Sequence, residues 1–308
     1  MRTRLLSTLS ILLLAACGGT LEGTAPIGTA LPSPSPVAAS GGPVILPLIV
    51  SSELAKGPTR FLFSLTDAQN ELIAAPDVDV ALEFYDTDRD PDAVVFDEEA
   101  DFIWALEGER GLYVANVDFP EAGRWGTRFT ATFPDGRTET VRADYDVLED
   151  TRTPSIGEEV PSVETPTAAS TGDDLRALST DPDPEPRFYR TSVDDALAAN
   201  EPFVLVFATP AFCQTRTCGP TLETIKEVAA EYPDLTFINV EPFVMEVRDG
   251  SLQPVLSAEG QLRQAPWTAA WQLVSEPFVA VVDGSGLMQA KFEGVLGADE
   301  LRNALQTL

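Results

Sequence analysis

Residues 203–220 read FVLVFATPAFCQTRTCGP, and this stretch decides the fold expected for the C-terminal part of the chain. Residues 203–207 form an uninterrupted apolar run, which is typical of a strand buried on both faces. Beyond Pro220, apolar residues recur at helical spacing, at Leu222, Ile225, Val228, Ala229 and Tyr232. The stretch therefore predicts a buried strand, a loop that carries two cysteines, and an amphipathic helix.

The spacing of the two cysteines limits where they can lie. Cys213 and Cys218 are five positions apart, an offset that turns by about 500° on a helix and leaves the side chains roughly 140° apart. They cannot both be helical and bonded, so we place Cys213 on the loop and Cys218 just before the helix. Gly219 is then the cap and Pro220 the first helical residue. Arg216 and the helix start both favour a thiolate.

The rest of residues 188–308 extends this pattern in both directions. Its periodicity predicts the order helix, strand, helix, strand, a long insert with helical character, two strands and a closing helix. The expected strands are residues 203–207, 236–240, 278–282 and 287–292. Pro277 stands immediately before the third of them, where its missing amide would remove a ladder hydrogen bond.

This arrangement resembles the thioredoxin-like domains, an α/β fold in which helices flank a central mixed sheet. The resemblance implies that Cys213 is the exposed nucleophile, that Cys218 is the resolving thiol, and that Pro277 is a cis-proline that shapes the substrate edge. The sequence departs from the family pattern in two ways. Four residues separate the cysteines instead of two, and Phe207 stands where many members carry a buried acid.

Residues 44–149 show a different period. Apolar and polar residues alternate in several short runs, and Pro134-Asp135-Gly136 is typical of a hairpin turn between the last two. This pattern predicts an all-β sandwich, and it loosely resembles bacterial immunoglobulin-like modules. Residues 150–187, rich in proline and acids, are predicted to be an extended linker between the two domains.

The first residues have the composition of an export signal. Arg2 and Arg4 precede an apolar run over residues 5–14, and Leu14-Ala15-Ala16-Cys17 resembles the lipobox of bacterial lipoproteins. The resemblance implies that residues 1–16 are a signal peptide and that Cys17 is acylated. Residues 17–43 would then be a flexible stalk. We therefore expect a lipoprotein anchored to the cell membrane on its extracytoplasmic side.

The composition excludes several classes of function. The chain has 49 acidic residues against 20 basic ones, a formal charge of −29, which argues against nucleic acid as a partner. It has no histidine, so neither a Ser-His-Asp or Cys-His nucleophile nor a His-ligated metal can be built. Acidic residues 86–90 lack the glycine and terminal Glu of a calcium loop. We expect no cofactor.

Three functions remain open for the cysteine pair. The first is thiol–disulfide exchange with the thiols or disulfides of envelope proteins, in an oxidising compartment. The second is a redox-silent scaffold or binding lipoprotein with an inert bridge. Closing so short a loop stabilises a fold by only about 2 kcal/mol, which argues mildly for redox use. The third is copper delivery, with Met245 and Met288 as further ligands, although such methionines usually fill cores.

Overall fold

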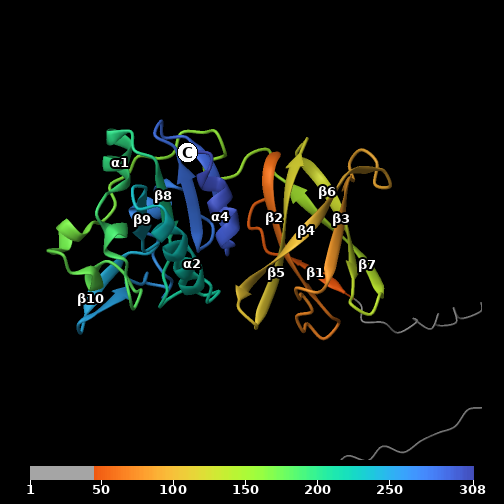
Figure 1. Cartoon of the computed structure of the whole chain (residues 1–308), viewed down its shortest axis with the longest axis horizontal. Helices are drawn as coiled ribbons and strands as arrows, with labels where there is room; N and C mark the ends of the chain where they lie inside the picture. The colour runs from red at the N-terminus through yellow and green to blue at the C-terminus, as the bar shows by residue number, and fades with distance from the viewer. Residues whose placement is uncertain (1–44) are drawn as a thin grey trace, which may run out of the picture. The chain divides into compact units, whose positions relative to one another are not determined.

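The computed structural model describes residues 45–308, and Figure 1 shows the arrangement of its elements. The expected signal peptide, the stalk and Cys17 lie outside the described residues. Strands predominate within them: thirteen strands accompany four α-helices and three short 3₁₀ helices. Among these residues, no helix is long and apolar enough to cross a membrane.

The largest element is an antiparallel sheet of seven strands. The order across the sheet is β1-β2-β5-β4-β3-β6-β7. The strands are β1 (Leu46–Ile49), β2 (Gly57–Thr66), β3 (Asp79–Asp86), β4 (Val94–Leu106), β5 (Arg110–Phe119), β6 (Gly123–Thr132) and β7 (Thr138–Val147). Their inward side chains form one aromatic core that includes Phe61, Phe63, Phe84, Phe129 and Trp125. The alternation in the sequence therefore located the strands and their buried face.

The predicted sandwich of two separate sheets is wrong, because one sheet runs through all seven strands. β4 is thirteen residues long: its first half pairs with β3, and its second half, from Asp101, pairs with β5. The edges also approach each other. The Leu148 carbonyl accepts from the Lys56 amide at 2.9 Å, and the Leu148 amide donates to the Leu54 carbonyl at 2.8 Å. The sheet is therefore nearly closed. Period-two alternation fixes which face is buried but not which strand is the neighbour.

A smaller sheet of four strands holds the cysteine region. Its order is β13-β12-β8-β9, in which β8 and β9 are parallel and the other neighbours are antiparallel. The strands are β8 (Phe203–Phe207), β9 (Thr236–Val240), β12 (Phe278–Val282) and β13 (Met288–Glu293). The helices are α1 (Val193–Ala199), α2 (Cys218–Glu231), α3 (Pro266–Ala270) and α4 (Ala298–Leu305). The four strand positions agree with the sequence prediction to within one residue.

The expected fold class, an α/β thioredoxin-like fold preceded by a sandwich, is contradicted by the chain that the structure describes. The chain is mostly β, its dominant element is the nearly closed seven-stranded sheet, and α1 and α3 have only seven and five residues. The insert expected to be helical contains a hairpin, β10 (Met245–Arg248) and β11 (Ser251–Pro254). Asp249 and Gly250 close it with φ values of 51° and 78°, the left-handed pair that a tight hairpin needs.

Residues 150–187 also differ from the extended linker that was predicted. They contain η1 (Ala168–Thr171) and η2 (Leu175–Ala177), and η3 (Pro186–Tyr189) follows at their end. The Val160 amide donates to the Gly286 carbonyl at 2.9 Å, and Val160 and Leu178 are buried. Proline and acid content indicates extension only when the apolar residues between them have no surface to cover, and here they cover the four-stranded sheet.

Candidate functional site

The two cysteines form a disulfide at the start of α2. Their Cα atoms are 6.0 Å apart, Cys213 is half-buried on the loop after β8, and Cys218 is 0% exposed. The helix begins at Cys218 with Thr217 as its N-cap, two residues before the predicted first helical residue, Pro220. A proline is tolerated there because the first amides of a helix have no intrahelical acceptor. The free amide of Cys218 is thus available to the partner sulfur.

Two hydrogen-bonding groups approach the exposed sulfur. The Cys218 backbone N–H donates to Cys213 Sγ at 3.2 Å, and Thr215 Oγ1 lies 3.2 Å from the same sulfur. Thr215 Oγ1 is also 2.7 Å from Thr217 Oγ1. Donors placed in this way stabilise a thiolate more than a thiol, because hydrogen bonds to a charged acceptor are the stronger ones. The helix start adds its partial positive charge.

Arg216, the cation expected to favour a thiolate, contributes its backbone to the turn of the loop. Its backbone takes the left-handed conformation, with a φ of 65°, and its N–H donates to the Cys213 carbonyl at 3.3 Å. The structure thus gives Arg216 a role in the turn that brings the cysteines together. A different arginine contacts the loop: Arg110 Nη1, from β5, donates to the Thr215 carbonyl at 3.4 Å.

The Glu276–Pro277 peptide bond is cis, as the sequence predicted, and Pro277 is buried next to β12. The segment before it lines a cavity of about 620 Å³ together with the disulfide loop: Ser275 and Glu276 form one part of the wall, and Thr215 and Thr217 another. Burial raises the pKa of the Glu276 carboxyl. The structure therefore brings the cysteine loop and the segment of Pro277 around a common cavity.

The opposite wall of this cavity comes from the seven-stranded sheet. It is apolar and includes exposed side chains of β1 and the turn after β2, namely Leu46, Leu48, Val50 and Leu72. Among residues 45–308, β1 pairs with β2 alone. We call this cavity, bounded by β1, the disulfide loop and residues 275–276, the apolar groove. Sequence reasoning missed it because no local pattern relates residues 46–72 to residues 213–218.

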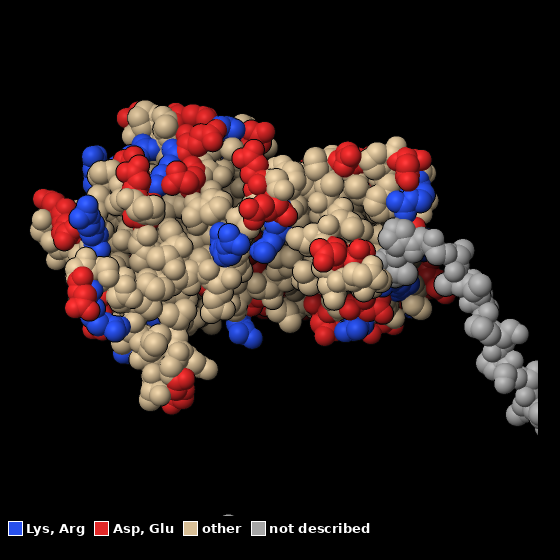
Figure 2. All heavy atoms as spheres, turned by 90° about the horizontal axis from the view of Figure 1, so that it is seen from below, with Lys and Arg blue, Asp and Glu red and all other residues tan. Residues whose placement is uncertain are grey.

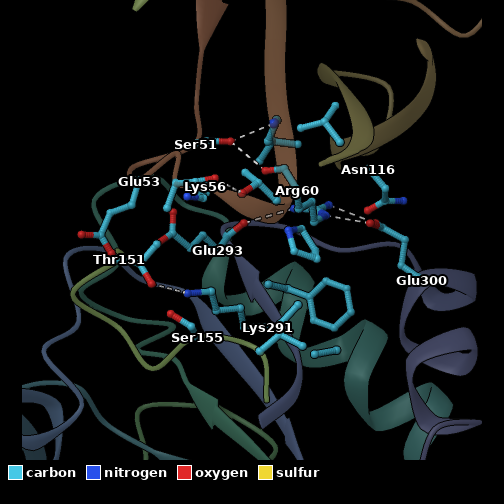
Figure 3. A pocket seen from close by; sticks show the side chains of 18 of the residues that line it. Ser51, Glu53, Lys56, Arg60, Asn116, Thr151, Ser155, Lys291, Glu293 and Glu300 are labelled. Carbon is cyan, nitrogen blue, oxygen red and sulfur yellow. Dashed lines mark hydrogen bonds and ion pairs between the residues drawn. The ribbon is translucent and has the colours of Figure 1, made fainter. Parts of the chain in front are cut away.

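A second cavity, of about 500 Å³, is lined by several charged side chains (Figure 3). Arg60 Nε lies 2.7 Å from Glu300 Oε1, and Lys291 donates to the hydroxyls of Thr151 and Thr153 at 2.7 and 3.0 Å. Burial lowers the pKa of Lys291. These charged groups bond to each other and to neighbouring hydroxyls: Arg60 of β2 contacts α4, and Lys291 of β13 contacts the segment after β7.

The copper hypothesis receives no geometric support. Met288 is fully buried in the core cluster of Phe207 and Trp271, whereas Cys218, the first residue of α2, packs in a different core cluster. Both thiols are used in the disulfide. Figure 2 shows a face on which acidic side chains are interspersed with fewer basic ones across a broad uncharged surface. The expectation that nucleic acid is no partner stays a prediction.

Comparison with known proteins gives little guidance. No family model and no curated protein matches the chain. Among solved structures, the soluble domain of PmoD from a Methylocystis species is 16% identical over 35% of this chain and 93% of its own, with a TM-score of 0.22. A putative glycoside hydrolase from Bacteroides vulgatus is 10% identical over 72% of this chain and 37% of its own, with a TM-score of 0.23. MtrC from Shewanella baltica is 11% identical over 80% of this chain and 51% of its own, with a TM-score of 0.24. Similarities this low support neither a fold nor a function.

Proposed function

We propose that this protein exchanges disulfides with the thiols of extracytoplasmic proteins through Cys213 and Cys218. The observation that carries the proposal is the setting of the Cys213 sulfur, which is half-buried, with the Cys218 amide and the Thr215 hydroxyl each 3.2 Å away. Thr215 itself lines the apolar groove. An inert bridge needs neither the access nor the donors. The acylated Cys17 predicted from the sequence would hold the protein at the membrane, facing an oxidising compartment.

The exchange proceeds in two balanced steps. A thiolate of the substrate protein attacks Cys213 Sγ, the bond between the two cysteines breaks, and Cys218 leaves as a thiolate. A second substrate thiolate then attacks the substrate sulfur of the mixed disulfide, and Cys213 leaves. The substrate loses two electrons and gains a disulfide, while this protein is left with two thiols. Run backwards, the same steps reduce a substrate disulfide.

Exposure decides which sulfur is attacked. Cys218 is the first residue of α2, is 0% exposed and belongs to a core cluster, so a protein thiol can reach only Cys213. The apolar groove continues from Thr215 and Thr217 of the disulfide loop to β1, and it offers an extended substrate segment an apolar surface beside that loop. The occupant we assign to the groove is therefore the segment of the substrate that carries the thiol. Such a segment could also pair with the free edge of β1.

Trapping tests the proposal. In Cys218→Ser, the reduced Cys213 should capture a substrate protein as a mixed disulfide that cannot be resolved, whereas the matched variant Cys213→Ser should capture far less. The captured species are identified by mass spectrometry after alkylation and separation without reductant. If neither variant captures a protein, and the pair has a reduction potential below about −300 mV, the bridge is structural and the protein is a scaffold.

A further inference from the structure

The cavity of about 500 Å³ shown in Figure 3 contains a lysine that differs from the other two lysines of the chain. Lys56 and Lys226 each lie within 3.6 Å of two carboxylates. Among residues 45–308, Lys291 makes no ion pair, and its side-chain nitrogen is bonded to two hydroxyls instead. Carboxylates are plentiful in a chain with 49 acidic residues against 20 basic ones, so a lysine held apart from them requires an explanation.

The two hydroxyls hold the Lys291 nitrogen as acceptors. Lys291 Nζ donates to Thr151 Oγ1 at 2.7 Å and to Thr153 Oγ1 at 3.0 Å (Figure 3). A hydroxyl has one hydrogen, and both are used elsewhere. Thr151 donates to the Thr153 carbonyl at 2.7 Å, and Thr153 donates to Glu53 Oε2 at 3.5 Å. An uncharged amine has two N–H groups and one lone pair, so this site can hold both N–H groups and leave the lone pair for an electrophile.

The surroundings of Lys291 also favour its uncharged form. Burial lowers the pKa of Lys291. The negative charges of Glu293, Glu53 and Glu158 oppose this shift without cancelling it. By contrast, a hydrogen bond to a carboxylate raises the pKa of Lys56. A larger share of Lys291 is therefore free amine near neutral pH, and the free amine is the nucleophilic form of a lysine.

A proton donor lies on the same strand. Glu293 follows Lys291 by two positions in β13, and side chains at that spacing point to the same face of a strand. Both residues line the cavity. Burial raises the pKa of Glu293, although a hydrogen bond from the Ser52 amide opposes the shift. One face of β13 thus presents an amine and a carboxylic acid to the same space.

We infer that Lys291 binds an uncharged aldehyde in this cavity as an imine. A volume of about 500 Å³ lies within the range of small-ligand pockets, and Leu62, Val117 and Phe292 supply apolar walls. Acidic side chains outnumber basic ones in the lining, so an anionic carbonyl compound such as a keto acid is disfavoured. This inference is independent of the cysteine chemistry.

The reaction is a condensation without a change of oxidation state. The lone pair of Lys291 Nζ attacks the carbonyl carbon, and the carbonyl oxygen takes up a proton from the nitrogen to give a carbinolamine. The Glu293 carboxyl then gives its proton to the hydroxyl, which leaves as water while the C=N bond forms. The nitrogen returns a proton to the Glu293 carboxylate. The net products are one imine and one water.

Reductive trapping with benzaldehyde tests the inference. Sodium cyanoborohydride converts an imine into a stable secondary amine, and peptide mapping by mass spectrometry reports the label on each lysine of the unaltered chain. We expect Lys291 to be labelled about tenfold faster than Lys56 at neutral pH, the effect of roughly 1.4 kcal/mol. Exposure alone predicts the reverse order, because the Lys56 side chain is 40% exposed and Lys291 is largely buried. In urea the preference should disappear, and glyoxylate, an anionic aldehyde, should label Lys291 more slowly than benzaldehyde.

The inference is overturned if Lys56 or Lys226 is labelled as fast as Lys291 in the folded chain, if the preference persists in urea, or if glyoxylate labels Lys291 as fast as benzaldehyde. Glu293→Gln tests the proton donor and should slow the labelling of Lys291 by about tenfold or more. Glu158→Gln removes a nearby negative charge without changing the cavity lining, so it should not slow labelling. Equal rates in these two variants would overturn the role of Glu293. The comparison of lysines within the unaltered chain needs no variant to fold.

Discussion

Replacing Thr215 by Val tests whether the setting of the Cys213 sulfur serves exchange. The substitution keeps the shape of the side chain and removes the hydroxyl 3.2 Å from Cys213 Sγ. A hydrogen bond to a charged group contributes about 1.5–3 kcal/mol, and Thr215 is exposed, so the lower end applies. A loss of about 1.4 kcal/mol from the thiolate raises the pKa of the Cys213 thiol by about one unit. The Cys218 amide remains, so the pKa stays below that of a free cysteine.

The same loss predicts the direction of change in the reduction potential. The hydroxyl stabilises the reduced form only when Cys213 is ionised, so the variant should be more reducing by about 30 mV at a pH above both thiol pKa values. The difference should vanish at a pH well below them. Equilibration with glutathione over a range of pH measures this potential, and the rate of alkylation measures the pKa. Thr224→Val, which removes a hydroxyl in α2 that bonds the Pro220 carbonyl and not the sulfur, is the matched control. Equal potentials and pKa values for the two variants would refute the reasoning.

Three other outcomes are expected. Leu48 is 55% exposed and lines the apolar groove, so Leu48→Gln should slow exchange with protein substrates by about tenfold and leave exchange with glutathione unchanged. Val247, 56% exposed, lies outside the groove, and Val247→Gln should change neither rate. Burial raises the pKa of Glu293 above 4.5, so the free energy of unfolding should fall as the pH rises from that value towards the folded-state pKa. Urea titrations should show a flatter decline for Glu293→Gln. The same pH dependence in the variant and the unaltered chain would contradict this expectation. Mass spectrometry of the membrane fraction should find an acylated chain that begins at Cys17, and Cys17→Ser should release the protein.

Local patterns in the sequence predicted the elements of the structure better than their assembly. The cis bond before Pro277, which the family resemblance implied, is present. The apolar run at 203–207 and the strands at 236–240 and 278–282 were predicted correctly from local patterns. Each depends on residues close together in the chain. The single nearly closed sheet, by contrast, depends on β4 pairing with two different strands, and hydrophobic periodicity carries no information about partners.

The candidate site shows the same division. The resemblance made Cys213, Cys218 and Pro277 the expected site residues, and their roles stay predictions; the structure shows the two cysteines bonded and the bond before Pro277 cis. Sequence reasoning did not identify Thr215 as the group beside the sulfur, and it assigned the local cation to Arg216. The left-handed backbone at Arg216 sets the turn, and only the turn decides which side chain faces the sulfur. The hairpin at Asp249-Gly250 is different, because its turn signal was present in the sequence and was outweighed by an expectation of helix.

The seven-stranded sheet supplies one wall of the proposed exchange site. Arg60 of β2 makes a paired contact with both carboxylate oxygens of Glu300, at 2.7 and 3.0 Å, and also donates to the Val295 carbonyl at 2.9 Å. The Arg60 and Glu300 side chains are both largely buried, so this two-bond contact fixes the position of β2 against α4. With β2 held there, its neighbour β1 supplies the apolar wall opposite the disulfide loop, and Arg110 holds the loop itself. A groove whose two walls are fixed in this way is preorganised for a substrate segment, and the specificity of exchange would then reside in β1, far from the cysteines in sequence.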